Sequence, residues 1–451
     1  MSGFRLSPDA LPLQRGDIVG GQVQEGDVVA GPAMRGNIVA GLSSLDAASW
    51  PATSCRNAEG IHYHAACEVS ASADGTAPLA VAVTDSRGLA MAAPLFSLTY
   101  RLDTPFQGSL GAWTGRLVDQ FPGLLALGLL GVGSPMADHC HFVRRDWLSA
   151  SEGTTAHALL IDAVEREARR RKAAVIVFKD VAPEDEMLVG NLLAAKGFTR
   201  LASLPVAVAD VGDTEDAYLA RLSNATRKDI RRKLKSRDGI RIERRNDIAG
   251  LEEQIAALYR STQENSKLRY GDFEELPRGY FTEVAQRLGK DAVFQLYWVG
   301  DRLAAFNLLL VGADRVVDKF LGMAYPLARE HNLYVVSWME NLRFCREIGR
   351  PMLQTGQTAY ASKLRMGSRL VPSAIYAKHT NGLLNRGLAA IAPWLALDRW
   401  DPDLREARAK TRAFPFFTET RKRFNSLFYA IPGRKTAAHF SWNCSSKAGE
   451  Q

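Results

Sequence analysis

One order of predicted elements occurs twice along this 451-residue chain. In each half, two adjoining apolar runs predict the strands of a β-hairpin, and a long helix and a further strand follow. In the first half these elements are expected at 78–84, 89–100, 154–170 and 173–178. In the second half they are expected at 292–299, 303–311, 327–348 and 352–355. The duplication predicts an α/β (α+β) fold made of two related domains in tandem.

The length supports two or three domains, because 451 residues exceed one ordinary core and 46% of them are hydrophobic. We expect the first domain at 46–212 and the second, catalytic one at 213–380. Residues 1–45 contain a ten-residue repeat with the pattern Gly-Asp/Asn-Ile/Val-Val. We interpret it as a flexible leader, although each copy could form one short strand. Residues 381–451 are rich in aromatic and basic residues and are predicted to form a helical tail.

Charge and cysteine content restrict the setting in which the chain works. Five widely scattered cysteines do not suggest a disulfide framework and fit a reducing compartment. No signal-peptide pattern is present at the start, and the longest uncharged run, 121–137, is interrupted by Pro and Gly. We therefore expect a cytoplasmic protein with no transmembrane segment. The net charge of +8 allows an anionic partner but is too modest to indicate one.

Residues 224–237, NATRKDIRRKLKSR, contain seven Lys or Arg. The block is predicted to be a helix capped by Ser223, and one narrow stripe of four residues can pack: Leu222, Thr226, Ile230 and Leu234. It is either a solvated charged face at the domain junction or a wall that binds phosphates. DNA is not an expected partner, since no aromatic platform or known nucleic-acid fold surrounds the block.

Several stretches together resemble a known family. They are LLALGLLGVGSP (124–135), HALLIDAVEREARRRKAAVIVFKDV (157–181), DAYLARLSNATRKDIRRKLK (216–235), WVGDRLAAFNLLL (298–310) and QTGQTAYASKLRMGSRLVP (354–372). In this order they resemble the FemAB-like branch of the GNAT acyltransferase superfamily, the two-copy peptidoglycan biosynthesis/recognition type, over about residues 75–380. The resemblance implies tandem GNAT-like domains with mixed sheets.

The same resemblance implies N-acyl transfer from acyl-CoA, such as acetyl-CoA, to a small-molecule or cell-wall-precursor amine. It implies no tightly bound cofactor. Two alternatives stay open: a FemAB-type transferase that uses aminoacyl-tRNA and acts on a cell-wall or lipid precursor, and a catalytically inactive GNAT-like binding module. The last is favoured by residues 326–334, PLAREHNLY, where a phosphate-binding loop would carry glycine and this chain has none.

Acyl transfer to an amine needs a base, donors for the oxyanion and an acid for the leaving group. We predict Asp318 as the base, with Tyr360 and Lys363 as further catalytic residues; the resemblance places Lys363 in a K-x-x-x-G stretch. The predicted cofactor-binding residues are Lys319, Gln357, Arg365, Arg231 and Arg232, and the predicted substrate-binding residues are Asn307 and Tyr270. For Asn307, Asp318 and Lys319 the favoured alternative is an ordinary exposed strand face.

Other polar residues receive simpler interpretations. Glu340 lies in a predicted helix and is interpreted as a solvent-facing charge. The histidines of His62-x-His64 and His139-Cys140-His141 lack the spacing of a four-ligand zinc site, so no metal is expected.

Overall fold

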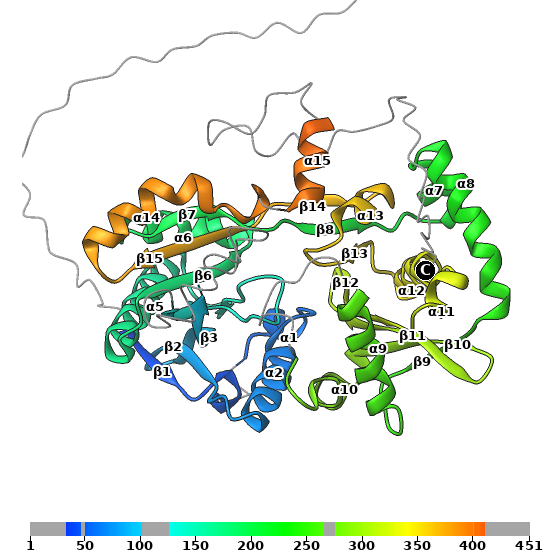
Figure 1. The fold of residues 1–451 in the computed structure, drawn as a ribbon. Coiled ribbons are helices and arrows are strands. Elements are labelled where there is room, and N and C mark those ends of the chain that lie inside the picture. Colours follow the sequence, from blue (N-terminus) through cyan, green and yellow to red (C-terminus); the bar gives the residue numbers. More distant parts are fainter. Residues whose placement is uncertain (1–32, 47–49, 102–125, 266–275, 400, 411–451) are drawn as a thin grey trace, which may run out of the picture.

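The computed structural model describes residues 33–46, 50–101, 126–265, 276–399 and 401–410. Within them the chain forms two mixed sheets that lie side by side, each with helices packed against it (Figure 1). Both sheets are antiparallel except for one parallel pair each. This confirms the predicted α/β class with tandem mixed-sheet domains. In the described ranges, no helix is both long and apolar enough to cross a bilayer.

The first sheet runs in the order β1 (Arg35–Val39), β2 (Leu79–Asp85), β3 (Gly88–Arg101), β4 (Ala126–Val132), β6 (Val175–Val181), β15 (Ala374–His379) and β7 (Thr199–Ala202). The short strand β5 (Val143–Arg144) pairs with β3. The accompanying helices are α1 (Ala52–Cys55), α2 (Ile61–Ala73), α5 (Ala150–Arg171) and α6 (Pro183–Ala195). The predicted hairpin is thus β2–β3, and the predicted helix and strand are α5 and β6.

The second sheet runs in the order β9 (Arg241–Arg245), β10 (Ala292–Val299), β11 (Arg302–Val311), β12 (Arg315–Met323), β13 (Met352–Gln354), β8 (Val206–Asp210) and β14 (Arg369–Val371). Its helices are α7 (Glu215–Ala220), α8 (Asn224–Lys233), α9 (Glu252–Asn265), α10 (Tyr280–Leu288), α11 (Leu327–Glu330), α12 (Leu333–Glu347) and α13 (Tyr360–Arg365). The single helix predicted at 327–348 is wrong: Asn332 adopts a left-handed conformation (φ 52°) and separates α11 from α12.

The two sheets exchange one strand. β8 comes from the sequence range expected for the first domain, yet it lies between β13 and β14 of the second sheet. β15 comes from the range expected for the second domain, yet it lies between β6 and β7 of the first sheet. Each exchanged strand occupies the same place, next to the last strand of its host sheet. Each sheet is therefore completed by a strand that belongs, in sequence, with the other.

The ends of the described chain also join the first sheet. The third copy of the ten-residue repeat forms β1, whose Ile38 pairs with Val81; the first two copies lie outside the described residues. Gly36 is needed there, because a Cβ would lie 2.6 Å from the Leu159 carbonyl oxygen of α5. After β15, the chain forms α14 (Gly382–Leu395) and α15 (Pro402–Lys410), the described part of the predicted helical extension.

Candidate active site

The parallel strands β12 and β13 separate in the middle of the second sheet. They pair at three positions, the last being Val317 with Gln354. β12 then continues along β11, whereas the backbone N–H of Thr355 donates to Ala207 of β8. We call the place where they part the strand fork and define it by Asp318, Lys319, Gln354, Thr355 and Gly356. Polar side chains gather here within an otherwise apolar sheet.

A β-bulge directs the two charged residues of β12 to different surroundings. The register of β12 on β11 places Phe320 opposite Leu308 and Asp318 opposite Leu309, so Lys319 is the extra residue. Such an insertion changes the direction in which neighbouring side chains point. Asp318 consequently meets side chains of the second sheet and α12, while Lys319 reaches residues of the first half of the chain.

Asp318 is held by two amide side chains. Asn307 Nδ2 donates to one carboxylate oxygen at 2.8 Å, and Asn341 Nδ2 donates to the other at 3.0 Å. Burial raises the pKa of Asp318 to about 6, although both amides and the positive charge of Lys363 oppose the shift. The residue is half-buried, so a substrate can approach it, and a pKa of about 6 allows it to accept a proton near neutral pH. These are the properties of a general base.

Lys319 links the two halves of the molecule. Its Nζ lies 2.5 Å from Glu59 Oε1 and 3.0 Å from Asp138 Oδ1, and all three side chains are buried. Gln354 Nε2 donates to the second oxygen of Asp138 at 2.8 Å. Although burial opposes it, Lys319 holds the pKa of Asp138 well below its usual range. The alternative of an exposed strand face is therefore wrong for Lys319, and it is also wrong for Asn307, which is fully buried.

Lys363 enters the fork from α13. It is buried, its Nζ donates to the backbone carbonyl of Thr355, and burial lowers its pKa to about 8. A Cβ added to Gly356 would lie 4.0 Å from this nitrogen and 3.9 Å from the carboxylate oxygens of Asp138. Four of the predicted site residues thus converge on one place in the structure: Asn307, Asp318, Lys319 and Lys363.

The remaining predicted residues near α13 contact the segment before β8. Tyr360 is buried and its hydroxyl donates to the Pro205 carbonyl at 2.7 Å. Gln357 Nε2 donates to the Leu204 carbonyl at 2.9 Å. Tyr270 lies outside the described residues.

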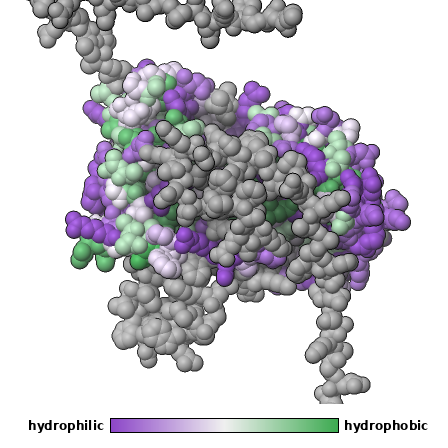
Figure 2. Space-filling model, turned by 90° about the horizontal axis from the view of Figure 1, so that it is seen from above, coloured by the Kyte–Doolittle hydropathy of each residue, from purple (hydrophilic) through white to green (hydrophobic). Residues whose placement is uncertain are grey.

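The predicted arginines form a separate cluster on α8 and α13. Arg232 donates to Asp229 at 2.7 Å, Arg365 also pairs with Asp229, and Arg231 pairs with Asp216 at 3.4 Å. The edge of the molecule where α8 lies in Figure 1 is predominantly hydrophilic at the right of Figure 2. Because Lys363 and Arg365 share α13, this short helix joins the basic cluster to the fork.

The helix of the basic block is anchored as its apolar stripe predicts. Thr226 and Ile230 are buried, and the Ser223 hydroxyl caps the helix by accepting from Thr226 N at 3.2 Å. Beyond the end of α8, Arg237 Nε lies 2.6 Å from Glu340 Oε1 on α12. The interpretation of Glu340 as solvent-facing is wrong: it is buried.

Two residues that the sequence analysis missed extend the site. Gln295 of β10 and Asn341 of α12 are fully buried, and Gln295 Nε2 donates to Asn341 Oδ1 at 2.9 Å. The signal for Gln295 was available, because it is an amide within the apolar run AVFQLYWV, as Asn307 is within its own strand. Asn341 lies in a helix of mixed character, where no pattern distinguishes it.

The first half of the chain does not offer an open phosphate-binding helix end either. The N-terminus of α5 in the first half is closed by a capping box, in which Ser149 and Glu152 satisfy each other's backbone N–H groups. A carboxylate at this position competes with a phosphate. Among the described residues, no three His, Cys, Asp or Glu side chains are grouped to hold a metal ion.

A family model agrees with this architecture. Residues 224–363, which include the strand fork and the basic helix, match the model described as an acetyltransferase (GNAT) domain. The chain therefore contains a GNAT-type domain, and the resemblance noted in the sequence is confirmed at this level. No curated protein is similar enough in sequence to count as a match.

Solved structures with a similar backbone include one tandem GNAT protein. FemX is 15% identical, with a TM-score of 0.47, and the likeness covers 72% of this chain and 92% of FemX. A tandem GNAT protein from the clavulanic acid biosynthesis pathway is 11% identical, with a TM-score of 0.43 and coverage of 77% and 99%. The C-terminal domain of a putative lysylphosphatidylglycerol synthetase from Agrobacterium fabrum is 13% identical, with a TM-score of 0.42 and coverage of 67% and 84%.

Proposed function

We propose that this protein is an N-acyltransferase that moves an acyl group from acyl-CoA to an amine, and that catalysis takes place at the strand fork of the second domain. The observation that carries the proposal is Asp318, a half-buried carboxylate with a pKa of about 6 at the fork of a GNAT-type domain. Acyl-CoA is a cytoplasmic metabolite, so the proposal also places the protein in the cytoplasm.

The chemistry requires one proton acceptor and one positive charge. Asp318 takes a proton from the ammonium form of the acceptor, and the neutral nitrogen attacks the thioester carbonyl carbon. The C–N bond forms, and Lys363, the buried cation of α13, stabilises the oxyanion. The C–S bond then breaks, and the protonated Asp318 gives its proton to the departing thiolate. The Asp318 carboxylate then takes the remaining extra proton from the new amide nitrogen and releases it to solvent. Asn307 and Asn341 hold the carboxylate in place.

The basic cluster supplies a second part of the proposal. Arg231, Arg232 and Arg365 are exposed or partly exposed, and they bind the phosphates of the donor in this scheme. Gln357 and Tyr360 position α13 through their bonds to the segment before β8. The double variant Arg231→Glu with Arg232→Glu should lose affinity for the acyl donor and keep its fold. Unchanged affinity would mean that these arginines form an ordinary solvated surface with no role in binding.

A second candidate is a FemAB-type transferase that uses aminoacyl-tRNA. It is favoured by the exposed basic surface of residues 224–237, where Lys228 of α8 and Lys235 just after it form no ion pair within the described residues. A large polyanion suits such a surface better than a single cofactor does. An inactive binding module is the third candidate, favoured by a fork that Lys319, Asp138 and Lys363 already fill.

One assay separates the three candidates. The full chain is incubated with acetyl-CoA, octanoyl-CoA or palmitoyl-CoA and a set of amines, and free thiol and acylated amine are measured; aminoacyl-tRNA is tested in parallel. Thiol release that depends on the amine supports the main proposal, and transfer from tRNA alone supports the second. If neither acyl-CoA nor aminoacyl-tRNA gives a product, the inactive binding module is the candidate that remains. Asp318→Asn should lower the transfer rate by about 10²–10⁴-fold, while Asp162→Asn, at a partly exposed position of α5, should not change it.

A further inference from the structure

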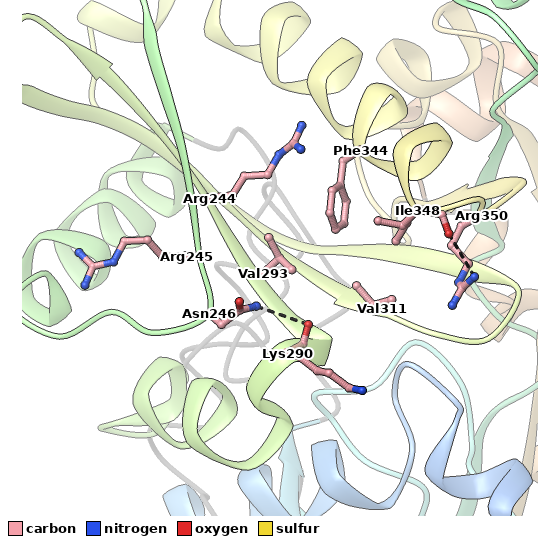
Figure 3. Close-up of a pocket in the computed structure, with 9 residues that line it drawn as sticks. All are labelled: Arg244, Arg245, Asn246, Lys290, Val293, Val311, Phe344, Ile348 and Arg350. Atoms are coloured by element: carbon pink, nitrogen blue, oxygen red, sulfur yellow. Dashed lines mark hydrogen bonds between the residues drawn. The ribbon is translucent and has the colours of Figure 1, made fainter.

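A pocket of about 310 Å³ lies beside the second sheet, away from the residues that line the fork. It opens between the start of β10, the end of β11 and the last turn of α12. Its floor is apolar and consists of Val293, Val311, Phe344 and Ile348. Figure 3 shows these four gathered between Arg244 on one side and Arg350 on the other, with Lys290 below. We call it the basic pocket.

The cations of the basic pocket are incompletely neutralised. Among the residues that the structure describes, no Asp or Glu lines it. Arg350 donates to the carbonyls of Gly312 and Ile348 and, like Lys290, forms no ion pair within the described residues. Arg244 pairs with the exposed Glu347, which is thus a local competitor for an incoming anion. Asp314, whose pKa is lowered mainly by Arg315 and also by Arg350, is a second one. Arg245 points away from the floor and pairs with Asp247 at 2.6 Å.

We propose that the basic pocket binds a small organic anion, a carboxylate or phosphate attached to an aromatic or branched aliphatic group. The guanidinium of Arg244 lies 5.0 Å from the centre of the Phe344 ring, so one ligand can meet both the charge and the apolar floor. A neutral apolar compound would leave the cations desolvated without a partner, and an inorganic anion would leave the floor in contact with water. Both parts of the ligand are needed.

Occupancy of the pocket is coupled to the fork by a buried chain of amides. Arg244 Nε donates to Gln295 Oε1 at 2.8 Å, Gln295 donates to Asn341, and Asn341 donates to Asp318. Since an amide has one accepting and one donating end, the arginine at one end determines the direction of both amides. An anion that draws Arg244 away from Gln295 allows the two amide side chains to change their orientation. The hydrogen bond from Asn341 to the Asp318 carboxylate is then weakened. This coupling rests on the proposed function of Asp318, whereas binding of the anion in the basic pocket does not.

Binding is tested by calorimetry on the full chain with phenyl phosphate, phenylacetate, inorganic phosphate and benzyl alcohol. We expect one or both aromatic anions to bind, with inorganic phosphate at least tenfold weaker and benzyl alcohol weaker still. The two aromatic anions distinguish a phosphate site from a carboxylate site. Equal binding of inorganic phosphate, or no binding of either aromatic anion, would overturn the proposal.

Two variants locate the binding with opposite signs. Lys290→Ala with Arg350→Ala should weaken binding of the aromatic anion at least tenfold. Glu347→Gln removes the competing carboxylate and should tighten binding several-fold, an effect that damage to the fold would not produce. Unchanged affinity in both variants would mean that the anion binds elsewhere.

The coupling has its own test. Saturating aromatic anion should move the acid limb of the pH–rate profile to higher pH in the wild type, because the Asp318 carboxylate loses support. Gln295→Met interrupts the chain and should remove this shift while binding persists. Binding without a shift in the wild type would refute the coupling alone, and binding in a protein with no transfer activity would leave the site intact and refute the proposed function.

Discussion

A single inserted residue in β12 separates two charges that are neighbours in sequence. Asp318 remains among amides with its pKa raised by burial, whereas Lys319 is turned toward two carboxylates from the other half of the molecule. The two positions have different tasks for this reason. Asp318 can change its charge near neutral pH, and Lys319 keeps its charge because Asp138 and Glu59 raise its pKa against the effect of burial.

The first prediction concerns Asp318→Asn. The variant cannot accept a proton, so kcat for acyl transfer should fall by about 10²–10⁴-fold. In the wild type the rate should rise with pH through about 6 as the carboxylate ionises, and this limb should be absent from any residual activity of the variant. Rates measured from pH 5 to 8 check both points; a retained limb near pH 6 would assign the base elsewhere.

Lys319→Met tests the link between the halves. It leaves Glu59 and Asp138 buried without a cation, which should cost about 3–5 kcal/mol of unfolding free energy at pH 8. Without Lys319, burial raises the folded-state pKa of these carboxyls above the unfolded value, so the penalty is present at high pH and is relieved as they protonate. Urea unfolding at pH 8 and pH 4.5 should therefore show a smaller deficit at pH 4.5.

A matched control is Lys290→Met, at an exposed position, where a change within about 0.5 kcal/mol is expected. A deficit for Lys319→Met that does not depend on pH would show that lost packing, rather than unpaired charge, is responsible.

At the level of elements, α8 shows how a highly charged segment becomes a fixed part of the fold. Its packing depends on a stripe one residue wide, and most of its cations form ion pairs within the molecule, with Asp216 and Asp229. Whether this basic segment binds phosphates therefore depends on the few cations that remain unpaired. The cap at Ser223 fixes where this helix begins.

Ser223→Ala should cost about 1 kcal/mol, because the N–H of Thr226 loses its acceptor. Ser223→Asn supplies another capping oxygen and should cost much less. Thermal or urea unfolding of both variants measures the difference, and equal losses would show that the cap does not determine the stability of α8.

Sequence patterns predicted those elements whose signals are local. Both hairpins, α5 and the stripe of α8 follow from the period of apolar residues and from turn and cap residues close by. The bulge at Lys319 and the partners Glu59 and Asp138 could not be predicted, because they depend on register and on contacts across roughly 180 residues or more. Asp318 and Lys363 were found as candidates from their unusual context, but not as neighbours.

At the scale of the whole molecule, the exchanged strands make the two sheets depend on each other. β15 is an interior strand of the first sheet, between β6 and β7, although about 170 residues separate it from β7. β8 has the equivalent place in the second sheet. No local pattern assigns a strand to a partner, so the exchange could not be predicted from the run of residues at 374–379.

Ala377→Pro should expose this dependence. Proline removes a backbone donor from the ladder and is therefore strongly disfavoured in an interior strand. Hydrogen exchange measured by mass spectrometry should rise in β6 and β7, far away in sequence. Gly382→Pro, at the first position of α14 where proline is tolerated, is the control. Faster exchange confined to 374–379 would show that the first sheet holds together without β15.

The exchange also has a consequence for how the chain is made. A ribosome releases the N-terminus first, and most of the first sheet is available once residue 202 has emerged. β15 cannot join this sheet until residue 379 has been synthesised. The edges of β6 and β7 that pair with β15 therefore stay unpaired while some 180 further residues are added. During this interval the unpaired strand edges of the nascent chain can pair with other chains. Slow translation within the second half would prolong the time in which the chain can aggregate or bind chaperones.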